Sequence, residues 1–140
     1  MAENKWFDDQ VLSNIKKKVE ARMDLACEFT EGNMKLITSG HVGNDLKAID
    51  KGQYLNSFVH KVEVTPDEIL GVVANSAGHS PYIEFGTGKY AESGNGRQTP
   101  WAWQDDKGEW HFTHGMKSRP IMRIGFEESQ PGIKKILGVQ

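Results

Sequence analysis

Apolar side chains near the N-terminus recur with the spacing of an α-helix. From residue 7 to residue 26 they stand three or four positions apart, at Phe7, Val11, Ile15, Val19, Met23 and Ala26. This spacing places them on one face, so we predict an amphipathic helix over residues 6–29. Asp8 and Asp9 favour its start, because negative charge stabilises the positive end of the helix dipole. Gly32 and Asn33 are expected to end it.

A β-strand period follows in the middle of the chain. Alternate positions between residues 58 and 64 carry Phe58, His60, Val62 and Val64, which predicts a strand with these side chains on one face. Residues 68–75 form a second β-rich run. The Pro66-Asp67 pair supplies a turn, so the two runs are expected to pair as an antiparallel hairpin. The glycines and polar residues of 40–52 indicate loops around a short helical segment at residues 45–49.

Alternating aromatic residues predict a second hairpin, across a polar turn at residues 105–108. The aromatic positions are Trp101, Trp103, Trp110 and Phe112. The tryptophans have two open interpretations. They are either core-facing side chains of the hairpin or anchors of a protein interface, where Trp is favoured. The preceding stretch, residues 89–99, lacks a core pattern and is expected to be a mobile loop.

A second helix is predicted near the C-terminus. Pro120 suits the first turn of a helix, and Ile121 and Ile124 lie along one side of it. Pro131 is expected to limit this helix, with a last turn at residues 133–137. The predicted fold class is therefore α+β. It comprises a long N-terminal helix, a small mostly antiparallel β-sheet, and a C-terminal helix packed on the sheet.

Length and charge restrict the function. The chain has 140 residues, so we expect a single domain spanning residues 1–140. A net charge of -2 gives no electrostatic reason to expect nucleic-acid binding, and the basic run Lys16-Lys17-Lys18 is interpreted as a solvated helix face. The single Cys27 excludes an internal disulfide. No apolar run approaches the ~20 residues of a membrane span, so no membrane partner is expected.

The histidines are the first candidates for chemistry. His111 and His114, with Glu109 nearby, suggest a metal site, and hence a small metal-dependent hydrolase as the alternative function. However, the segment is predicted to be a strand that runs into a turn, where residues three apart point to opposite faces. Ser80 stands beside His79 but lacks the surroundings of an activated nucleophile. We therefore expect no enzyme activity, no catalytic residue, no metal and no cofactor.

Glu84 lies between apolar residues, just before the turn Gly86-Thr87-Gly88. Burying a carboxylate is costly unless it has a partner, and a guanidinium can hold it through two parallel hydrogen bonds. Arg119 and Arg123 are the candidate partners, and such a clamp would tie the turn to the C-terminal helix. The alternative is a solvent-facing glutamate at a turn. Gly86 and Gly88 are expected to serve backbone shape.

Several short motifs occur in an order that resembles a family of head–tail joining, or tail-completion, proteins of long-tailed double-stranded-DNA phages. The motifs are Gly52-x-x-Leu55-x-x-Phe58, Ser80-Pro81-Tyr82-Ile83-Glu84-Phe85-Gly86-Thr87-Gly88, Thr99-Pro100-Trp101, Gly108-x-Trp110-x-x-Thr113-x-Gly115 and Ser118-Arg119-Pro120-Ile121-Met122-Arg123. The chain departs from the family at Ile121-Met122, where Pro-Phe-Leu is common, and at Phe126, where Ala is common. The helix before residue 50 matches by type only.

The resemblance implies a non-catalytic structural protein of the virion, synthesised in the host cytoplasm. It implies a homo-oligomeric ring in the phage neck, a hexamer or as second choice a dodecamer, between the head connector or stopper ring and the tail-tube protein. DNA would pass through its lumen without sequence-specific binding. The residues expected at the structural motif or between protomers are Tyr82, Glu84, Phe85, Gly86, Gly88, Trp101, Trp103, Arg119, Pro120 and Arg123.

Overall fold

The computed structural model describes residues 2–40 and 52–139, with side chains from residue 8 onward in those ranges. The predicted helical segment at 45–49 and the side chain of Phe7 lie outside this description. In chain order the elements are α1 (Ala2–Thr38), α2 (Gln53–Asn56), β1 (Phe58–Val64), β2 (Ile69–Asn75), α3 (Ser80–Phe85), the 3-10 helix η1 (Gly88–Tyr90), β3 (Trp101–Gln104), β4 (Trp110–Thr113) and α4 (Ile121–Leu137). The α+β class is confirmed.

Helix α1 is the longest element, and it continues past the predicted end at Gly32 and Asn33. A glycine inside a helix costs about 1 kcal/mol relative to alanine. Packing further along outweighs that cost, since Met34 and Ile37 are both 2% exposed. Asn33 uses its side-chain amide to donate a 2.9 Å hydrogen bond to Ser129 Oγ on α4. The predicted helix end was therefore wrong because tertiary contacts override the local stop signals.

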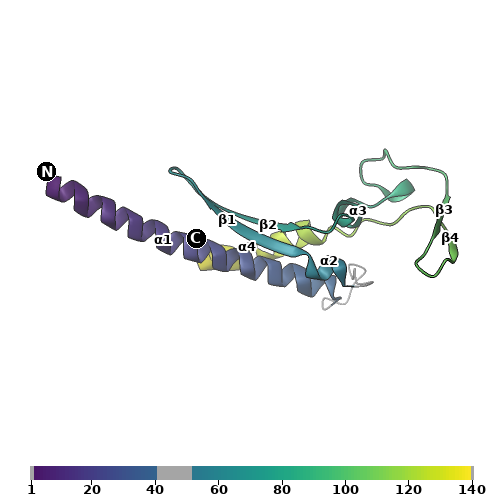
Figure 1. Cartoon of the computed structure of the whole chain (residues 1–140), viewed down its shortest axis with the longest axis horizontal. Helices are drawn as coiled ribbons and strands as arrows, with labels where there is room; N and C mark the ends of the chain where they lie inside the picture. Colours follow the sequence, from purple (N-terminus) through teal and green to yellow (C-terminus); the bar gives the residue numbers. More distant parts are fainter. Residues whose placement is uncertain (1, 41–51, 140) are drawn as a thin grey trace.

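The core lies against the C-terminal half of α1. Its buried hydrophobic residues are Met34, Ile37, Tyr54, Phe58, Ala77, Ile83 and Ile121. Tyr54 and Phe58 pack edge to face, with ring centroids 5.1 Å apart. Figure 1 shows why the core is confined to this region, because the other elements gather along one half of α1 and leave the N-terminal half alone.

The first hairpin matches its prediction closely. Strands β1 and β2 are antiparallel, with Phe58 opposite Asn75 and Val64 opposite Ile69. The hairpin lies on α1, and Gly71 allows this close approach. A Cβ built at Gly71 would lie 2.6 Å from Cys27 Sγ, so a larger residue would require the side chains of α1 to shift.

Helix α4 packs chiefly on α1, and the two hairpins form separate two-stranded sheets. Gly125 lets the two helices approach, since a Cβ there would lie 2.6 Å from Met34 Cγ. The helix runs through Pro131, which was predicted to limit it. Contacts with α1 on both sides of the proline, from the fully buried Ser129 and from Gly132 against Phe29, outweigh its missing N–H.

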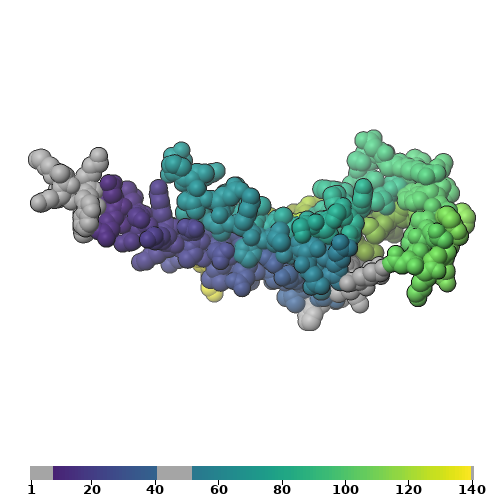
Figure 2. Space-filling model, in the orientation of Figure 1, coloured from purple at the N-terminus to yellow at the C-terminus, as the bar shows by residue number. Residues whose placement is uncertain are grey.

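The molecule is elongated (Figure 2). The N-terminal half of α1 extends to one end, and the β3–β4 hairpin stands at the other (Figure 1). In this hairpin Trp101 is opposite Thr113 and Trp103 is opposite His111. No helix within the described residues combines the length and the apolar character needed to cross a membrane.

Candidate functional site

Glu84 joins α3 to the start of α4. Its side chain is 9% exposed, and its two carboxylate oxygens accept hydrogen bonds from the backbone N–H groups of Met122 and Arg123, each 3.0 Å long. These N–H groups belong to the first turn of α4 and have no partner within the helix. A negative charge also stabilises the positive end of a helix dipole. Glu84 therefore caps α4 from a distant part of the chain.

The predicted guanidinium clamp on Glu84 was wrong, because backbone N–H groups hold the carboxylate and one of them belongs to the predicted partner Arg123. The predicted link between the turn and the C-terminal helix exists. The guanidinium of Arg123 donates a 3.2 Å hydrogen bond to Glu92 instead. This bond holds the pKa of the exposed Glu92 carboxyl below its usual range. Within residues 2–40 and 52–139, the Arg119 guanidinium makes no hydrogen bond or ion pair. The backbone N–H of Arg119 donates a 2.7 Å hydrogen bond to the carbonyl of Ile83. Pro120 follows at the N-cap position of α4.

The glycines of the motif let two backbone segments lie directly against each other. Gly86 has φ +78°, and a Cβ there would lie 2.9 Å from the carbonyl oxygen of Met116. Gly88 approaches His114 and Gly115 even more closely, so a side chain at either glycine is excluded. Thr87 completes the junction, because its N–H donates to Met116 O and its Oγ1 accepts from Met116 N, both at 2.9 Å. The Gly-Thr-Gly turn thus has a structural role.

Two groups of aromatic residues are exposed, and they include the predicted site residues Tyr82, Phe85 and Trp103. Tyr82 and Phe85 on α3 are 59% and 54% exposed. On β3–β4, the exposed fractions are 46% for Trp103, 66% for Trp110 and 82% for Phe112. A two-stranded hairpin is only marginally stable by itself. Of the two interpretations of the tryptophans, the exposure at Trp103 and Trp110 favours interface anchors, whereas Trp101 is half-buried beneath Arg97.

The structure changes the predicted metal-ligand set. Among the described side chains, Asp105, Glu109 and His111 bring ligand atoms within 4.8 Å of one another, and His114 is not in this group. Asp105 already accepts hydrogen bonds from the backbone N–H groups of Lys107 and Glu109, both 2.9 Å long, and His111 Nε2 lies 2.8 Å from its second oxygen. These contacts shape the turn of the hairpin. Trp103 stacks on His111 with centroids 4.7 Å apart.

The segment 89–99, which was predicted to be a loop, begins in a 3-10 helix. Its first residues belong to η1, and Gly96 packs closely on the carbonyl of Gly88. From Ala91 to Thr99 the chain forms no helix or strand. The loop therefore rests on the junction near its beginning.

His60 fastens the first hairpin to α1, a feature that the sequence did not single out. Its Nδ1 is in close contact with a carboxylate oxygen of Glu31, and its Nε2 lies 3.2 Å from Asp24. The hydrogen bond to Glu31 raises the pKa of His60, and both negative charges add to this. Burial acts to raise the pKa of Glu31, but the bonds from His60 and Lys35 outweigh it and leave that pKa lowered.

The N-terminal half of α1 carries an uncovered apolar stripe. Its members are Val11, Leu12, Ile15 and Val19, with exposed fractions of 41%, 55%, 50% and 39%. We call these four residues the ridge. The predicted basic run at residues 16–18 is also exposed, as expected of a solvated face. Sequence periodicity identified Val11, Ile15 and Val19 but not Leu12, and nothing in the periodicity indicated that the other elements would leave these side chains uncovered.

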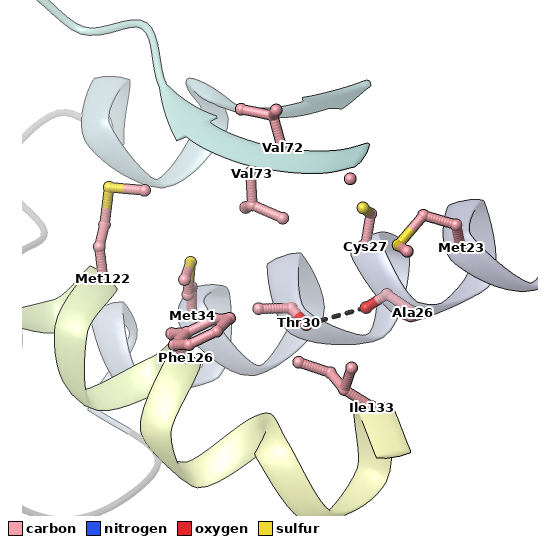
Figure 3. Close-up of a pocket in the computed structure, with 11 residues that line it drawn as sticks. Met23, Ala26, Cys27, Thr30, Met34, Val72, Val73, Met122, Phe126 and Ile133 are labelled. Carbon is pink, nitrogen blue, oxygen red and sulfur yellow. Dashed lines mark hydrogen bonds between the residues drawn. The ribbon is translucent and has the colours of Figure 1, made fainter. Parts of the chain in front are cut away.

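An apolar groove begins where the ridge ends. It lies between α1, β2 and α4 and has a volume of about 360 Å³ (Figure 3). Met23 and Met34 come from α1, Val73 from β2, and Met122 and Phe126 from α4. We call this space the groove. Cys27 contributes to its floor and is buried, and burial raises the pKa of its thiol.

The total exposed surface is large for the mass of the chain. It measures 9945 Å², whereas a compact monomer of 15.7 kDa exposes about 7,300 Å². The excess is roughly 2,600 Å².

Comparison with protein-family models, with curated proteins and with solved structures found no match for this chain. The function is therefore inferred from the chain's own residues and surfaces.

Proposed function

We propose that this chain is a structural subunit of a phage neck, a head–tail joining or tail-completion protein that self-associates into a ring. The observation that carries the proposal is the surface excess of roughly 2,600 Å² over a compact monomer of the same mass. An elongated chain with uncovered apolar surface is expected of a subunit that neighbouring copies complete.

The chemistry of the motif residues supports a structural role. Glu84, Gly86 and Gly88 are occupied by helix capping and by close backbone packing. The motif order that resembles the phage family is thus accounted for as a fold-building junction. A family of structural proteins is expected to share the residues that build such a junction.

The two ends of the molecule supply surfaces of the kind that assembly requires. The ridge lies at one end and the aromatic β3–β4 hairpin at the other (Figure 1). Aromatic residues, above all Trp, are favoured as interface anchors. We assign the hairpin to contact with the neighbouring neck component, the head connector or stopper ring on one side or the tail-tube protein on the other. DNA would pass through the lumen, and a net charge of -2 suits passage without tight binding.

The proposal is tested by measuring mass in solution. Native mass spectrometry and sedimentation velocity of the purified chain, alone and mixed with the tail-tube protein, should give a closed oligomer of six copies, or of twelve. Negative-stain images should show rings, and the protein should be present in purified virions. A chain that stays monomeric under all these conditions, or that is absent from virions, contradicts the proposal.

A metal-dependent hydrolase is the second candidate, and the specific observation in its favour is the cluster of Asp105, Glu109 and His111. Two carboxylates and an imidazole are a suitable donor set for zinc or manganese. Metal analysis of protein purified without a histidine tag distinguishes the two functions. Stoichiometric metal that is lost in His111→Ala, together with hydrolytic turnover, would favour the enzyme; metal-free protein that assembles would favour the neck subunit.

A further inference from the structure

The ridge and the groove are two parts of one apolar stripe on α1. Val11, Leu12, Ile15 and Val19 continue, at helical spacing, into Met23, Ala26 and Thr30. The stripe is exposed in its first part, and in its second part α4 and β2 stand on either side of it and form the groove. Figure 1 shows α1 running on toward its N-terminus beyond the end of α4.

The groove has the properties of a site for apolar side chains from a helix. Its lining is mostly apolar, and methionines come from two of its walls, Met23 and Met34 from α1 and Met122 from α4 (Figure 3). Methionine is flexible and adapts to the shape of an inserted group. A volume of about 360 Å³ accommodates a few side chains and leaves the helix that bears them outside. An amphipathic helix laid on such a groove presents residues at i, i+3, i+4 and i+7.

The ridge presents side chains at this spacing. Relative to Leu12, Ile15 is three positions on and Val19 is seven positions on, and Val11 stands four positions before Ile15. Ile15 and Leu12 are each at least 50% exposed, so they are available to a partner. The ridge is too close to the groove on the same rigid helix to turn back into it. The occupant must therefore come from another molecule.

A second copy of the chain is the occupant that the surface area favours. The exposed surface of the chain exceeds that of a compact monomer of the same mass, as expected of a subunit that other copies of itself complete. Every copy carries one ridge and one groove, so identical copies supply both halves of the contact in equal number. A ridge joined to a different surface makes a heterologous contact, which closes into a ring when the rotation between copies permits.

We propose that the ridge of one copy packs into the groove of the next copy, and that this contact repeats around the ring. The inference rests on the proposed self-association and deepens it by naming the two surfaces. Its competitor is symmetric pairing of one ridge with another, as in a two-fold dimer of helices. That arrangement leaves the groove empty and ends at two copies.

Two substitutions, each at an exposed position, separate these arrangements. Ile15→Glu places a charge on the ridge, and Phe126→Glu places one at the mouth of the groove, where Phe126 is 51% exposed. Both variants keep a good helix former. Asn14→Glu is the matched control, because Asn14 is exposed on α1 and lies off the ridge. Circular dichroism and thermal melting of each variant show whether the fold is retained.

In sedimentation velocity, each of the two variants alone should need at least about tenfold more protein for half-assembly than the unaltered chain, since an interface anchor contributes 1.4 kcal/mol or more. The control should assemble normally. In an equimolar mixture, the intact ridge of the Phe126→Glu chain meets the intact groove of the Ile15→Glu chain. The mixture should therefore form dimers and nothing larger.

The outcomes are distinct. If the unaltered chain assembles and Phe126→Glu does so equally well, or if the mixture stays monomeric, the ridge-to-groove contact is wrong while self-association stands. If the unaltered chain never assembles, the proposed function falls with it. As a second readout, a benzoylphenylalanine in place of Ile15 should crosslink between copies to a peptide that contains Phe126. Crosslinks from ridge to ridge, or their absence in the assembled protein, would overturn the inference.

Discussion

The two halves of α1 carry the same apolar stripe but have different surroundings. In the C-terminal half Ile37 is 2% exposed, whereas in the N-terminal half Ile15 is 50% exposed. The helix is continuous, and the residue type is the same. The difference comes from α4 and the β1–β2 hairpin, which cover one half and stop short of the other (Figure 1). Amphipathic spacing therefore shows which face of a helix is to be buried. Only the tertiary structure shows which part of that face the other elements cover.

The largest expected effect compares the two isoleucines directly. Ile37→Ala should lower the free energy of unfolding by about 2–5 kcal/mol, because it removes a buried side chain and leaves a cavity. Ile15→Ala should change it by less than about 0.5 kcal/mol under conditions that keep the chain monomeric. Urea denaturation of both variants at low protein concentration checks this. Equal losses at the two positions would mean that both halves are covered within one molecule.

The next effect concerns Glu84, which caps α4, the helix that packs on the C-terminal half of α1. Glu84→Ala should lower the free energy of unfolding by about 1–3 kcal/mol, since two backbone N–H groups at the start of α4 lose their acceptor. Glu92→Ala is the matched control, because it removes an exposed carboxylate that pairs with Arg123 and should cost much less than Glu84→Ala. Thermal or urea melts of the pair measure the difference. A control as damaging as Glu84→Ala would contradict the capping role.

A smaller effect concerns His60, which joins the β1–β2 hairpin to the C-terminal half of α1. Because the pKa of His60 is raised in the folded protein, chiefly by Glu31, the protonated form stabilises the fold. This contribution is complete below the ordinary histidine pKa of about 6.5 and is lost as the pH rises through the raised value. The lowered pKa of Glu31 sets the acid limit, since the pair weakens again when that carboxylate is protonated.

The melting temperature should therefore fall as the pH rises above about 6.5, through loss of a contribution of up to about 1 kcal/mol from this contact. His60→Gln should show a flatter profile over the same range, because glutamine does not titrate. Differential scanning calorimetry of both proteins at several pH values provides the comparison. Parallel profiles for the two proteins would show that another group causes the pH dependence.

The smallest effect is expected at the second uncovered region, the β3–β4 hairpin. Phe112 is 82% exposed, so Phe112→Ser should change the free energy of unfolding by less than about 0.5 kcal/mol. Its effect should appear only in binding to the neighbouring neck component. Calorimetry and a pull-down with the tail-tube and connector proteins measure the two properties. A large loss of stability would place Phe112 in the core of the molecule and not at an interface.

The sequence was sufficient for elements defined by local patterns. The strand at residues 58–64 and both hairpins follow from alternation and turn residues, and the fold class follows from them. Predictions failed where distant contacts outweigh local rules. Packing on α4 carries α1 past Gly32, and packing on α1 carries α4 through Pro131.

The candidate site shows the same limit. A buried partner for Glu84 was predictable from its apolar neighbours, but two backbone amides hold it, and amide donors leave no trace in the sequence. The metal-ligand group includes Asp105, which hairpin pairing brings toward His111, and excludes His114. The groove was not predictable, because its walls come from three elements that are far apart in the chain.

Hydrogen–deuterium exchange at several protein concentrations tests the central claim most directly. The claim is that the N-terminal half of α1 is completed by another copy, whereas the C-terminal half is completed within the chain. Amides of residues 8–22 should become slower to exchange as the concentration rises, and those of residues 26–38 should be protected at every concentration. Exchange at residues 8–22 that stays the same from dilute to concentrated protein would contradict the account.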